Sequence, residues 1–503
     1  MNRNLVSLLK GVCNKRQQDQ FVTEISSGKI LTYSEFWEIV CKHAGYLKNF
    51  GLKEYEKVGL MYRNSLEFMI DFFAILVNQS IVIPLNASLK DRELEYVFKD
   101  SNLQYVITEN NNRIDNFVNV VKSFYINNNT KLNKIDCPID EDIRENNLIE
   151  NTAIILYTSG STGKAKGVML SHDNLLYEMR NIIEAHKLTS EDKVLCVLPW
   201  FHINGLVITM LTPILAGHEI VIAEKFSQKN FWKWIDEYQI TWFSGVPTIY
   251  SYLLADETYS RHRSLRFARS ASSSLPINVL KEFEKRYHVP VIESYGMTEG
   301  GSQLTSNPIP PLKRKPGSVG IPYGVKMRII NDKGEKCNEG ESGEVQFLGN
   351  SITSGYYKKI QETKDSFEGK WLKTGDIGFI DSDGYLFLNG RIKELINRAG
   401  EKFSPKEIEE VLYKYKGIKL VATIGIPNDV YGEEVVAFCV VESNVIFSEK
   451  EAIEYCKKNL ADYKVPKRII CLDELPVGGN GKIQRLKLVN YFKGGNLIDE
   501  KKD

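Results

Sequence analysis

The sequence lacks most of the features that mark specialised classes of protein. Its eight cysteines are scattered and form no Cys-x-x-Cys pair or other metal-ligand spacing. Lysine plus arginine, at 65, nearly equals aspartate plus glutamate, at 64, so no overall charge favours nucleic acid. The first apolar run is soon broken by NKRQQDQ, and the longer runs contain charged or amide side chains. We therefore expect a cytoplasmic protein with reduced thiols, no nucleic-acid partner and no stable membrane insertion.

The length and composition are those of a multidomain globular protein. With 43% hydrophobic and 26% charged residues over 503 positions, the chain exceeds the size at which a single core stops growing. Amphipathic helices alternate with apolar strands between residues 32 and 107, which predicts an α/β fold with parallel sheets. Residues 108–150 are rich in polar side chains and predict surface loops with one short helix around 116–124.

The pattern changes in the second half of the chain. Short strands with turn signals follow residue 300, so this region is expected to be β-rich. After GYLFLNGR, a new series of helices and strands begins, which predicts a domain boundary near residues 390–393. We expect a large N-terminal domain, 1–390, of doubly wound sheets with a β-rich subdomain. A small α+β C-terminal domain, 391–503, would follow it.

A loop rich in glycine and hydroxyl groups follows the apolar strand 153–158. Backbone amides, hydroxyls and a cation bind phosphate oxygens, and Ser171 is expected to cap the helix that comes later. A flexible surface linker is the alternative, although the buried strand argues against it. The P-loop of common NTPases needs a glycine at position 158 and a hydroxyl after Lys164, where this chain has Thr158 and Ala165. The predicted phosphate-binding residues are Thr158, Ser159, Gly160, Ser161, Thr162, Gly163 and Lys166.

The loop YTSGSTGKAKGV resembles the signature of the adenylate-forming superfamily, which includes acyl-CoA synthetases, adenylation domains of nonribosomal synthetases and luciferases. Further matches follow in the family's order: PWFHINGL, SYGMTEGG, WLKTGDIG, GRIKELINRAGEKFSP and PVGGNGKIQR. The resemblance implies that ATP and Mg²⁺ activate a carboxylic acid to acyl-AMP, which then passes to a thiol. It also implies that the C-terminal domain is a mobile lid.

The resemblance also assigns residues to ATP. Thr298 would bind the α-phosphate, and Glu299 would hold a magnesium ion that bridges phosphate oxygens. Asp376 and Arg391 would contact the ribose, and Tyr295 would stack on the adenine. Each charged residue alone would more often be a solvated surface charge, but the motif context favours binding. The other positions that the resemblance places around ATP are Ser272, Ser294, Gly296 and Met297.

Three residues near the C-terminus are implied to serve the two half-reactions. Lys482, in GGNGKIQR, would contact the substrate carboxylate and the α-phosphate as negative charge builds during attack. Lys393 would be the hinge about which the lid rotates, and Gly400 would line the tunnel for the pantetheine arm. A solvated lysine is the alternative for both cations.

The motif PWFHINGL is implied to line the acyl pocket. His202 would be its gate and a catalytic candidate, although a buried histidine in the core is the alternative. Amino-acid-activating relatives place an aspartate after the Phe, and FHIN has none, so a free amino acid is disfavoured. The predicted pocket residues are His202, Ile203, Asn204, Leu206, Ile208, Ser294 and Ser302.

Within the superfamily, the residue sequences of several motifs are most similar to those of the oxalate–CoA ligases of plants and fungi. Those enzymes have a histidine near the position of the neutral Ser302, so an aliphatic or aryl acid is favoured over oxalate. CoA is the expected thiol, because the sequence shows no fused carrier domain. A separate acyl-carrier protein is the alternative acceptor. A non-catalytic ATP-binding regulator is the alternative class, but Glu299 and Lys482 are both present.

Overall fold

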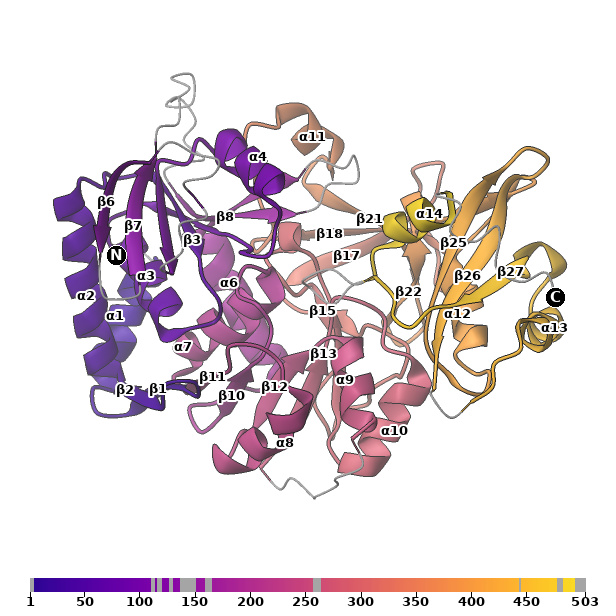
Figure 1. Cartoon of the computed structure of the whole chain (residues 1–503), viewed down its shortest axis with the longest axis horizontal. Coiled ribbons are helices and arrows are strands. Elements are labelled where there is room, and N and C mark those ends of the chain that lie inside the picture. Colours follow the sequence, from indigo (N-terminus) through magenta and orange to yellow (C-terminus); the bar gives the residue numbers. More distant parts are fainter. Residues whose placement is uncertain are drawn as a thin grey trace.

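Two large sheets form the N-terminal part of the computed structural model (Figure 1), which describes residues 4–109, 114, 120–125, 130–135, 151–158, 165–256, 264–442, 445–476 and 483–493. The nine-stranded sheet has the order β16-β15-β14-β13-β12-β10-β11-β1-β2. Its six central strands, β14, β13, β12, β10, β11 and β1, are parallel. Its strands are β1 (Gln20–Glu24), β2 (Lys29–Thr32), β10 (Lys193–Cys196), β11 (Glu219–Ile222), β12 (Trp242–Gly245), β13 (Phe267–Ser270), β14 (Val291–Tyr295), β15 (Thr305–Ser306) and β16 (Ile321–Pro322).

The eight-stranded sheet has the order β19-β9-β8-β4-β3-β5-β7-β6, with a parallel centre formed by β8, β4, β3 and β5. Its strands are β3 (Lys57–Met61), β4 (Ile81–Pro84), β5 (Tyr105–Glu109), β6 (Val120–Tyr125), β7 (Thr130–Ile135), β8 (Thr152–Thr158), β9 (Lys166–Ser171) and β19 (Gly355–Tyr356). The expected helix around 116–124 is therefore wrong over Val120–Tyr125. Its valines suit a strand, and pairing with β7 decides the outcome.

Helices cover these sheets and fill the space between them. They are α1 (Leu5–Lys15), α2 (Tyr33–Phe50), α3 (Leu66–Val77), α4 (Asp91–Ser101), α6 (His172–His186), the π-helix η3 (Asn204–Leu211), α7 (Thr212–Ala216), α8 (Gln228–Glu237), α9 (Pro247–Leu254), α10 (Ile277–Tyr287) and α11 (Ile360–Asp365). The largest core cluster joins α1, α2, α3 and α6 to strands of both sheets. Ser171 caps α6 as expected, because its Oγ accepts the N–H of Asn174 at 3.0 Å. The structure confirms the predicted α/β class.

Two smaller sheets follow. The first contains β17 (Val325–Ile330), β18 (Gly343–Gly349), β20 (Phe367–Glu368), β21 (Trp371–Ile380) and β22 (Leu386–Arg391). The second, at the opposite end of the molecule from α2 (Figure 1), contains β23 (Ile396–Arg398), β24 (Glu401–Phe403), β25 (Ile418–Asn428), β26 (Gly432–Val441) and β27 (Arg468–Cys471). Its helices are α12 (Pro405–Leu412), α13 (Glu449–Asn459) and α14 (Arg485–Lys493). The short 3-10 turns are η4 (Thr298–Gly300), η5 (Ile392–Glu394) and η6 (Asp462–Lys464).

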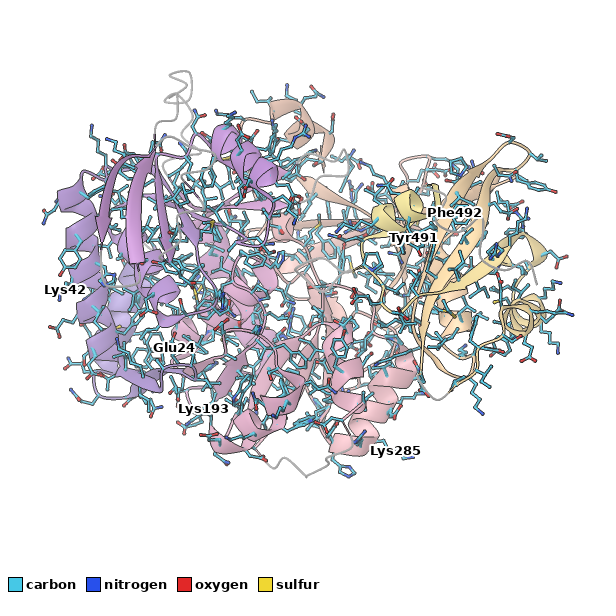
Figure 2. The ribbon with its side chains drawn as sticks, in the orientation of Figure 1. Glu24, Lys42, Lys193, Lys285, Tyr491 and Phe492 are labelled. Atoms are coloured by element: carbon cyan, nitrogen blue, oxygen red, sulfur yellow. The ribbon has the colours of Figure 1, made fainter. Side chains whose placement is uncertain are left out.

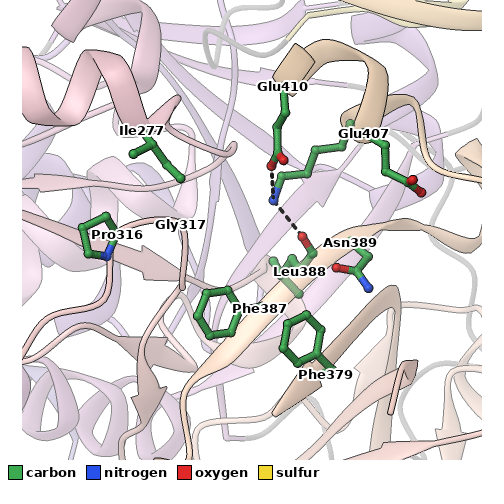
Figure 3. Close-up of a pocket in the computed structure, with 10 residues that line it drawn as sticks. Ile277, Pro316, Gly317, Phe379, Phe387, Leu388, Asn389, Glu407 and Glu410 are labelled. Carbon is green, nitrogen blue, oxygen red and sulfur yellow. Dashed lines mark hydrogen bonds and ion pairs between the residues drawn. The ribbon is translucent and has the colours of Figure 1, made fainter. Parts of the chain in front are cut away.

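The C-terminal part contacts the rest of the molecule beside α12 and through Lys419, whose Nζ lies 5.7 Å from the ring centroid of Tyr252. Lys406 Nζ donates to the carbonyl of Leu388 at 2.7 Å, and Asn278 Nδ2 donates to the carbonyl of Tyr413 at 3.5 Å. A cavity of about 250 Å³ lies between these parts (Figure 3). Its lining includes Ile277 and the stacked rings of Phe379 and Phe387, together with residues of α12. The boundary expected near 390–393 falls at η5 and stays a prediction.

The surface carries charges of both signs. Lys42 on α2, at the left of Figure 2, and Lys285 on α10, at the bottom, both extend outward. Among the residues that the structure describes, no helix combines the length and the apolar character that crossing a bilayer requires.

Candidate functional site

The turn after β14 is shaped by one glycine. A Cβ on Gly296 would lie 1.7 Å from the carbonyl oxygen of Ser302, so any side chain at this position would collide with backbone. The chain folds back through η4, and the N–H of Leu304 donates to the carbonyl of Tyr295 at 2.8 Å. This tight return leaves Glu299 largely buried, at 9% exposure, with the half-buried Thr298 beside it.

Three of the predicted nucleotide-binding residues meet where β14 approaches β21 and β22. Tyr295 Oη donates to Asp376 Oδ2 at 2.5 Å, and Arg391 Nε lies 2.8 Å from Asp376 Oδ1. Asp376 and Arg391 are directly paired across β21 and β22. The Asp376 carboxylate raises the pKa of the Arg391 guanidinium, and burial raises that of the Tyr295 phenol well above its usual range. Asp376 is thereby fixed in place and retains lone pairs for hydroxyl donors.

Glu299 is the candidate metal ligand. Its Oε1 accepts a hydrogen bond from Tyr356 Oη at 2.8 Å, and its main-chain carbonyl accepts the N–H of Thr353 at 2.8 Å. Among the described residues, no three His, Cys, Asp or Glu side chains gather as a metal site. One carboxylate fits Mg²⁺, which usually keeps waters and substrate phosphates as its other ligands. Glu299 would therefore hold an ion whose remaining ligands come from ATP and water, and the ion would neutralise phosphate charge there.

A buried polar network lies beside the predicted acyl pocket. Arg269, on β13 and only 2% exposed, donates through Nη1 to Asn204 Oδ1 at 2.8 Å and through Nε to Gln303 Oε1 at 3.1 Å. Asn204 Nδ2 in turn donates to Ser272 Oγ at 3.2 Å. His186 Nε2 lies 2.9 Å from Gln303 Oε1, and because that oxygen only accepts, Nε2 carries the proton. The network thus links two predicted site residues, Asn204 and Ser272, to a buried cation.

Burial sets the protonation of this network. It raises the pKa of the Glu178 carboxyl to about 8, and Glu178 Oε1 accepts the N–H of Gln303 at 2.6 Å. Burial also lowers the pKa of His186 to about 3, with Arg269 adding to the shift, and lowers that of Arg269 to about 10. Near neutral pH, Arg269 is charged and His186 is neutral, whereas burial shifts Glu178 toward its protonated form. The guanidinium therefore lacks a fully charged counter-ion at Glu178.

Replacing Glu178 by Gln is expected to reduce the loss of unfolding free energy that the wild type shows as pH rises from 4.5 to 8. The native pKa, about 8, lies above the reference value of 4.5, so the native state binds more protons than the unfolded state between these values. Wild-type stability therefore falls as pH rises from 4.5 through 8, by up to about 1.4 kcal/mol per unit. Urea unfolding of both proteins at pH 6 and pH 8 measures this loss. An equal loss of stability in the wild type and the variant would contradict the raised pKa of Glu178.

The remaining pocket candidates occupy different surroundings. Leu206 and Ile208 are fully buried in the largest core cluster, and Ile203 packs at its edge. His202 lies 4.5 Å, centroid to centroid, from the ring of Phe201. Ser294 and Ser306 share a hydrogen bond of 2.9 Å between β14 and β15. Their roles in acyl binding stay predictions, as does that of the buried Ser302.

The backbone explains two other predicted positions. Ser272 has a φ of +77°, in the left-handed region that favours glycine. Ala399 and Gly400, with φ of 56° and 90°, form the two-residue turn between β23 and β24. Gly400 is exposed in this arrangement, and Lys393 lies in η5. The hinge and tunnel roles stay predictions.

Several predicted residues lie outside the described part of the chain. They are Ser159, Gly160, Ser161, Thr162, Gly163 and Lys482. Conversely, motif reasoning missed Glu178, Arg269, Gln303 and Tyr356. One feature of the sequence could have indicated Arg269, since it is a charged residue within the short buried strand FARS. The other three are recognisable only from their tertiary contacts.

Comparisons with known proteins identify the family of the chain. Residues 10–357 match the AMP-binding enzyme family, and residues 407–482 match the AMP-binding enzyme C-terminal domain. The chain is 35% identical to an oxalate–CoA ligase of Arabidopsis thaliana, over 97% of this chain and 98% of the relative. It is 40% identical to a sulfoacetate–CoA ligase of Cupriavidus necator over 67% of each. A 2-succinylbenzoate–CoA ligase of Listeria monocytogenes is 32% identical over 92% of this chain and 95% of that protein.

Solved structures give the same result. ATP-bound MatB from Rhodopseudomonas palustris superposes with a TM-score of 0.86 at 27% identity, covering 98% of this chain and 99% of that one. The o-succinylbenzoate CoA synthetase of Bacillus subtilis, in complex with ATP and magnesium, gives 0.82 at 25% identity, covering 96% and 98%. The chain belongs to the AMP-binding enzyme family.

Proposed function

We propose that this enzyme joins CoA to a small carboxylic acid that carries a second negative charge. Its class is established: it is an AMP-forming acid–CoA ligase that uses ATP and Mg²⁺. A carboxylate oxygen attacks the α-phosphorus and pyrophosphate leaves; the CoA sulfur then attacks the acyl carbon and AMP leaves. The site geometry indicates the charge of the acid that the enzyme would use.

The observation that carries the proposal is the buried Arg269. A guanidinium removed from water costs several kcal/mol unless a counter-ion compensates for it. Glu178 compensates this charge only in part, because burial raises the pKa of its carboxyl group. The bond from Arg269 to Asn204 brings this cation to the predicted acyl pocket. An acid with a second anionic group would provide the missing charge there.

The similar ligases include three whose substrates carry two acid groups, and also a long-chain-fatty-acid–CoA ligase of Bacillus subtilis that is 30% identical over 92% of this chain. Oxalate, sulfoacetate and 2-succinylbenzoate each carry two acid groups, and CoA ligases for all three are similar to this chain. The sequence alone favoured an aliphatic or aryl acid, because Ser302 is neutral. Arg269 supplies a positive charge that this reasoning did not include.

The other predicted residues would contact different parts of ATP. Asp376, held by Tyr295 and Arg391, would accept the ribose hydroxyls, and the loop that begins at Thr158 would enclose the phosphates. Lys482 would stabilise the charge that develops during attack. We also propose that residues 1–390 bind ATP and the acid, whereas 391–503 act as the lid.

The test is pyrophosphate release by the purified protein over matched acids, with and without CoA. Succinate, malonate, oxalate and sulfoacetate would each be compared with a monocarboxylate of similar size. We expect one dianionic acid to exceed its monocarboxylate partner at least tenfold in kcat/KM, about the value of one charge-assisted hydrogen bond. Equal or better use of monocarboxylates would overturn the proposed substrate class. Acid-dependent release that CoA does not accelerate would indicate a separate acyl-carrier protein as the acceptor.

A further inference from the structure

We infer that Tyr356 is a positioning residue that orients the metal ligand Glu299 and couples it to the phosphate-binding loop. The inference rests on Mg²⁺–ATP binding by this enzyme, and it is independent of which acid is activated. Tyr356 Oη donates to Glu299 Oε1 at 2.8 Å. Among the described residues, the structure shows no other side-chain donor to the Glu299 carboxylate. The second oxygen, Oε2, is therefore left for a metal ion.

The backbone of Tyr356 is held from several directions. β19 pairs with β9, which places Gly355 opposite Met169 and Tyr356 opposite Val168. The N–H of Tyr356 donates to Thr363 Oγ1 at 3.0 Å. A Cβ on Gly355 would lie 2.4 Å from the Thr363 methyl group, so glycine permits this close approach. These contacts fix the direction in which the tyrosine side chain leaves the strand.

Thr353 ties the same segment to the turn that contains Glu299. Its N–H donates to the carbonyl of Glu299 at 2.8 Å, and its hydroxyl donates to the carbonyl of Met169. Glu299 is consequently anchored through its main chain by Thr353 and through its side chain by Tyr356. Two anchors three residues apart hold the carboxylate in one orientation.

The ring of Tyr356 contacts the other side of the site. Lys166 Nζ lies 5.2 Å from the ring centroid, within the range of a cation–π contact. Lys166 is the first residue of β9 and belongs to the predicted phosphate-binding loop. Tyr356 therefore touches the predicted metal ligand with its hydroxyl and a predicted phosphate ligand with its ring.

Tyr356 is also suited to remain a donor. A carboxylate oxygen only accepts hydrogen bonds, so the Tyr356 hydroxyl supplies the proton in its contact with Glu299. Removing a residue that hydrogen-bonds a metal ligand commonly lowers the metal affinity by about 10- to 100-fold. A carboxylate without its donor would sample more orientations and bind the ion less tightly.

Y356F is the informative variant, because it keeps the ring over Lys166 and removes the hydroxyl. We expect the Mg²⁺ concentration for half-maximal pyrophosphate release to rise about tenfold, with kcat largely restored at saturating Mg²⁺. Calorimetric titration of ATP into the protein, with and without Mg²⁺ and without any acid, gives a second readout. Mg²⁺ should strengthen ATP binding less in Y356F than in the wild type.

Y357F is the matched control, because the adjacent ring packs in a different core cluster, 2% exposed. It should show the wild-type dependence on Mg²⁺. The inference fails if Y356F also keeps that dependence, or if it lowers kcat equally at every Mg²⁺ concentration. A wild type that binds Mg²⁺–ATP but releases no pyrophosphate with any acid would instead contradict the proposed substrate class.

Discussion

Replacing Lys482 by Ala is expected to slow acyl-adenylate formation by about 10²–10³. Lys482 lies outside the described residues, in the segment between Pro476 and Ile483. Its ammonium group would face the charge that builds as the carboxylate attacks the α-phosphorus. Acid-dependent pyrophosphate release measures this step directly, and thermal unfolding of the variant would show that it still folds.

K487A is the control for the lysine variant. Lys487 is exposed on α14, a few residues further along the chain, and its loss should leave both half-reactions unchanged. Transfer of a supplied acyl-AMP to CoA should also survive in K482A, because adenylation is already complete. Normal pyrophosphate release by K482A would show that Lys482 does not stabilise acyl-adenylate formation.

Replacing Arg269 by Met is expected to lower kcat/KM for the preferred dianionic acid by about 10²-fold. Hydrogen bonds to charged groups contribute about 1.5–3 kcal/mol each, and Met keeps a similar length without the charge. The monocarboxylate of matched size should lose far less. The ratio of the two kcat/KM values does not depend on how much of the variant is folded, so it separates selectivity from stability.

R266M provides the comparison for Arg269. Arg266 lies just before β13 and donates hydrogen bonds to Asp192 and to the carbonyl of Lys187, neither of which belongs to the Arg269 network. Its selectivity ratio should match that of the wild type. If R269M retained the wild-type ratio, Arg269 would be a structural cation and the substrate class would need another basis.

Local patterns were enough to predict most of the fold. The strand before the loop, the Ser171 cap and the strand that leads to Tyr295 depend on residues close in sequence. Motif context also brought together Tyr295, Asp376 and Arg391. The strand β6 was mispredicted, because its pairing with β7 outweighs a weak helical pattern.

The buried part of the site depends on contacts that no local pattern encodes. Arg269 on β13 meets Gln303 and Asn204, which are distant from it in sequence. Tyr356 reaches Glu299 across 57 positions of the chain. Such contacts follow from strand order and packing, so only the assembled fold reveals them.

The cavity beside α12 bears on the proposed movement of the C-terminal part. The cavity of about 250 Å³ under Ile277 leaves side chains without packing partners, so this interface gains less dispersion energy than a filled one. The hydrogen bonds from Lys406 and Asn278 end on main-chain carbonyls, which water can satisfy equally well. If the C-terminal part acts as the proposed lid, two of its orientations would then have similar free energies. The bound substrate, rather than the protein's own packing, would determine which of them predominates at each stage of turnover.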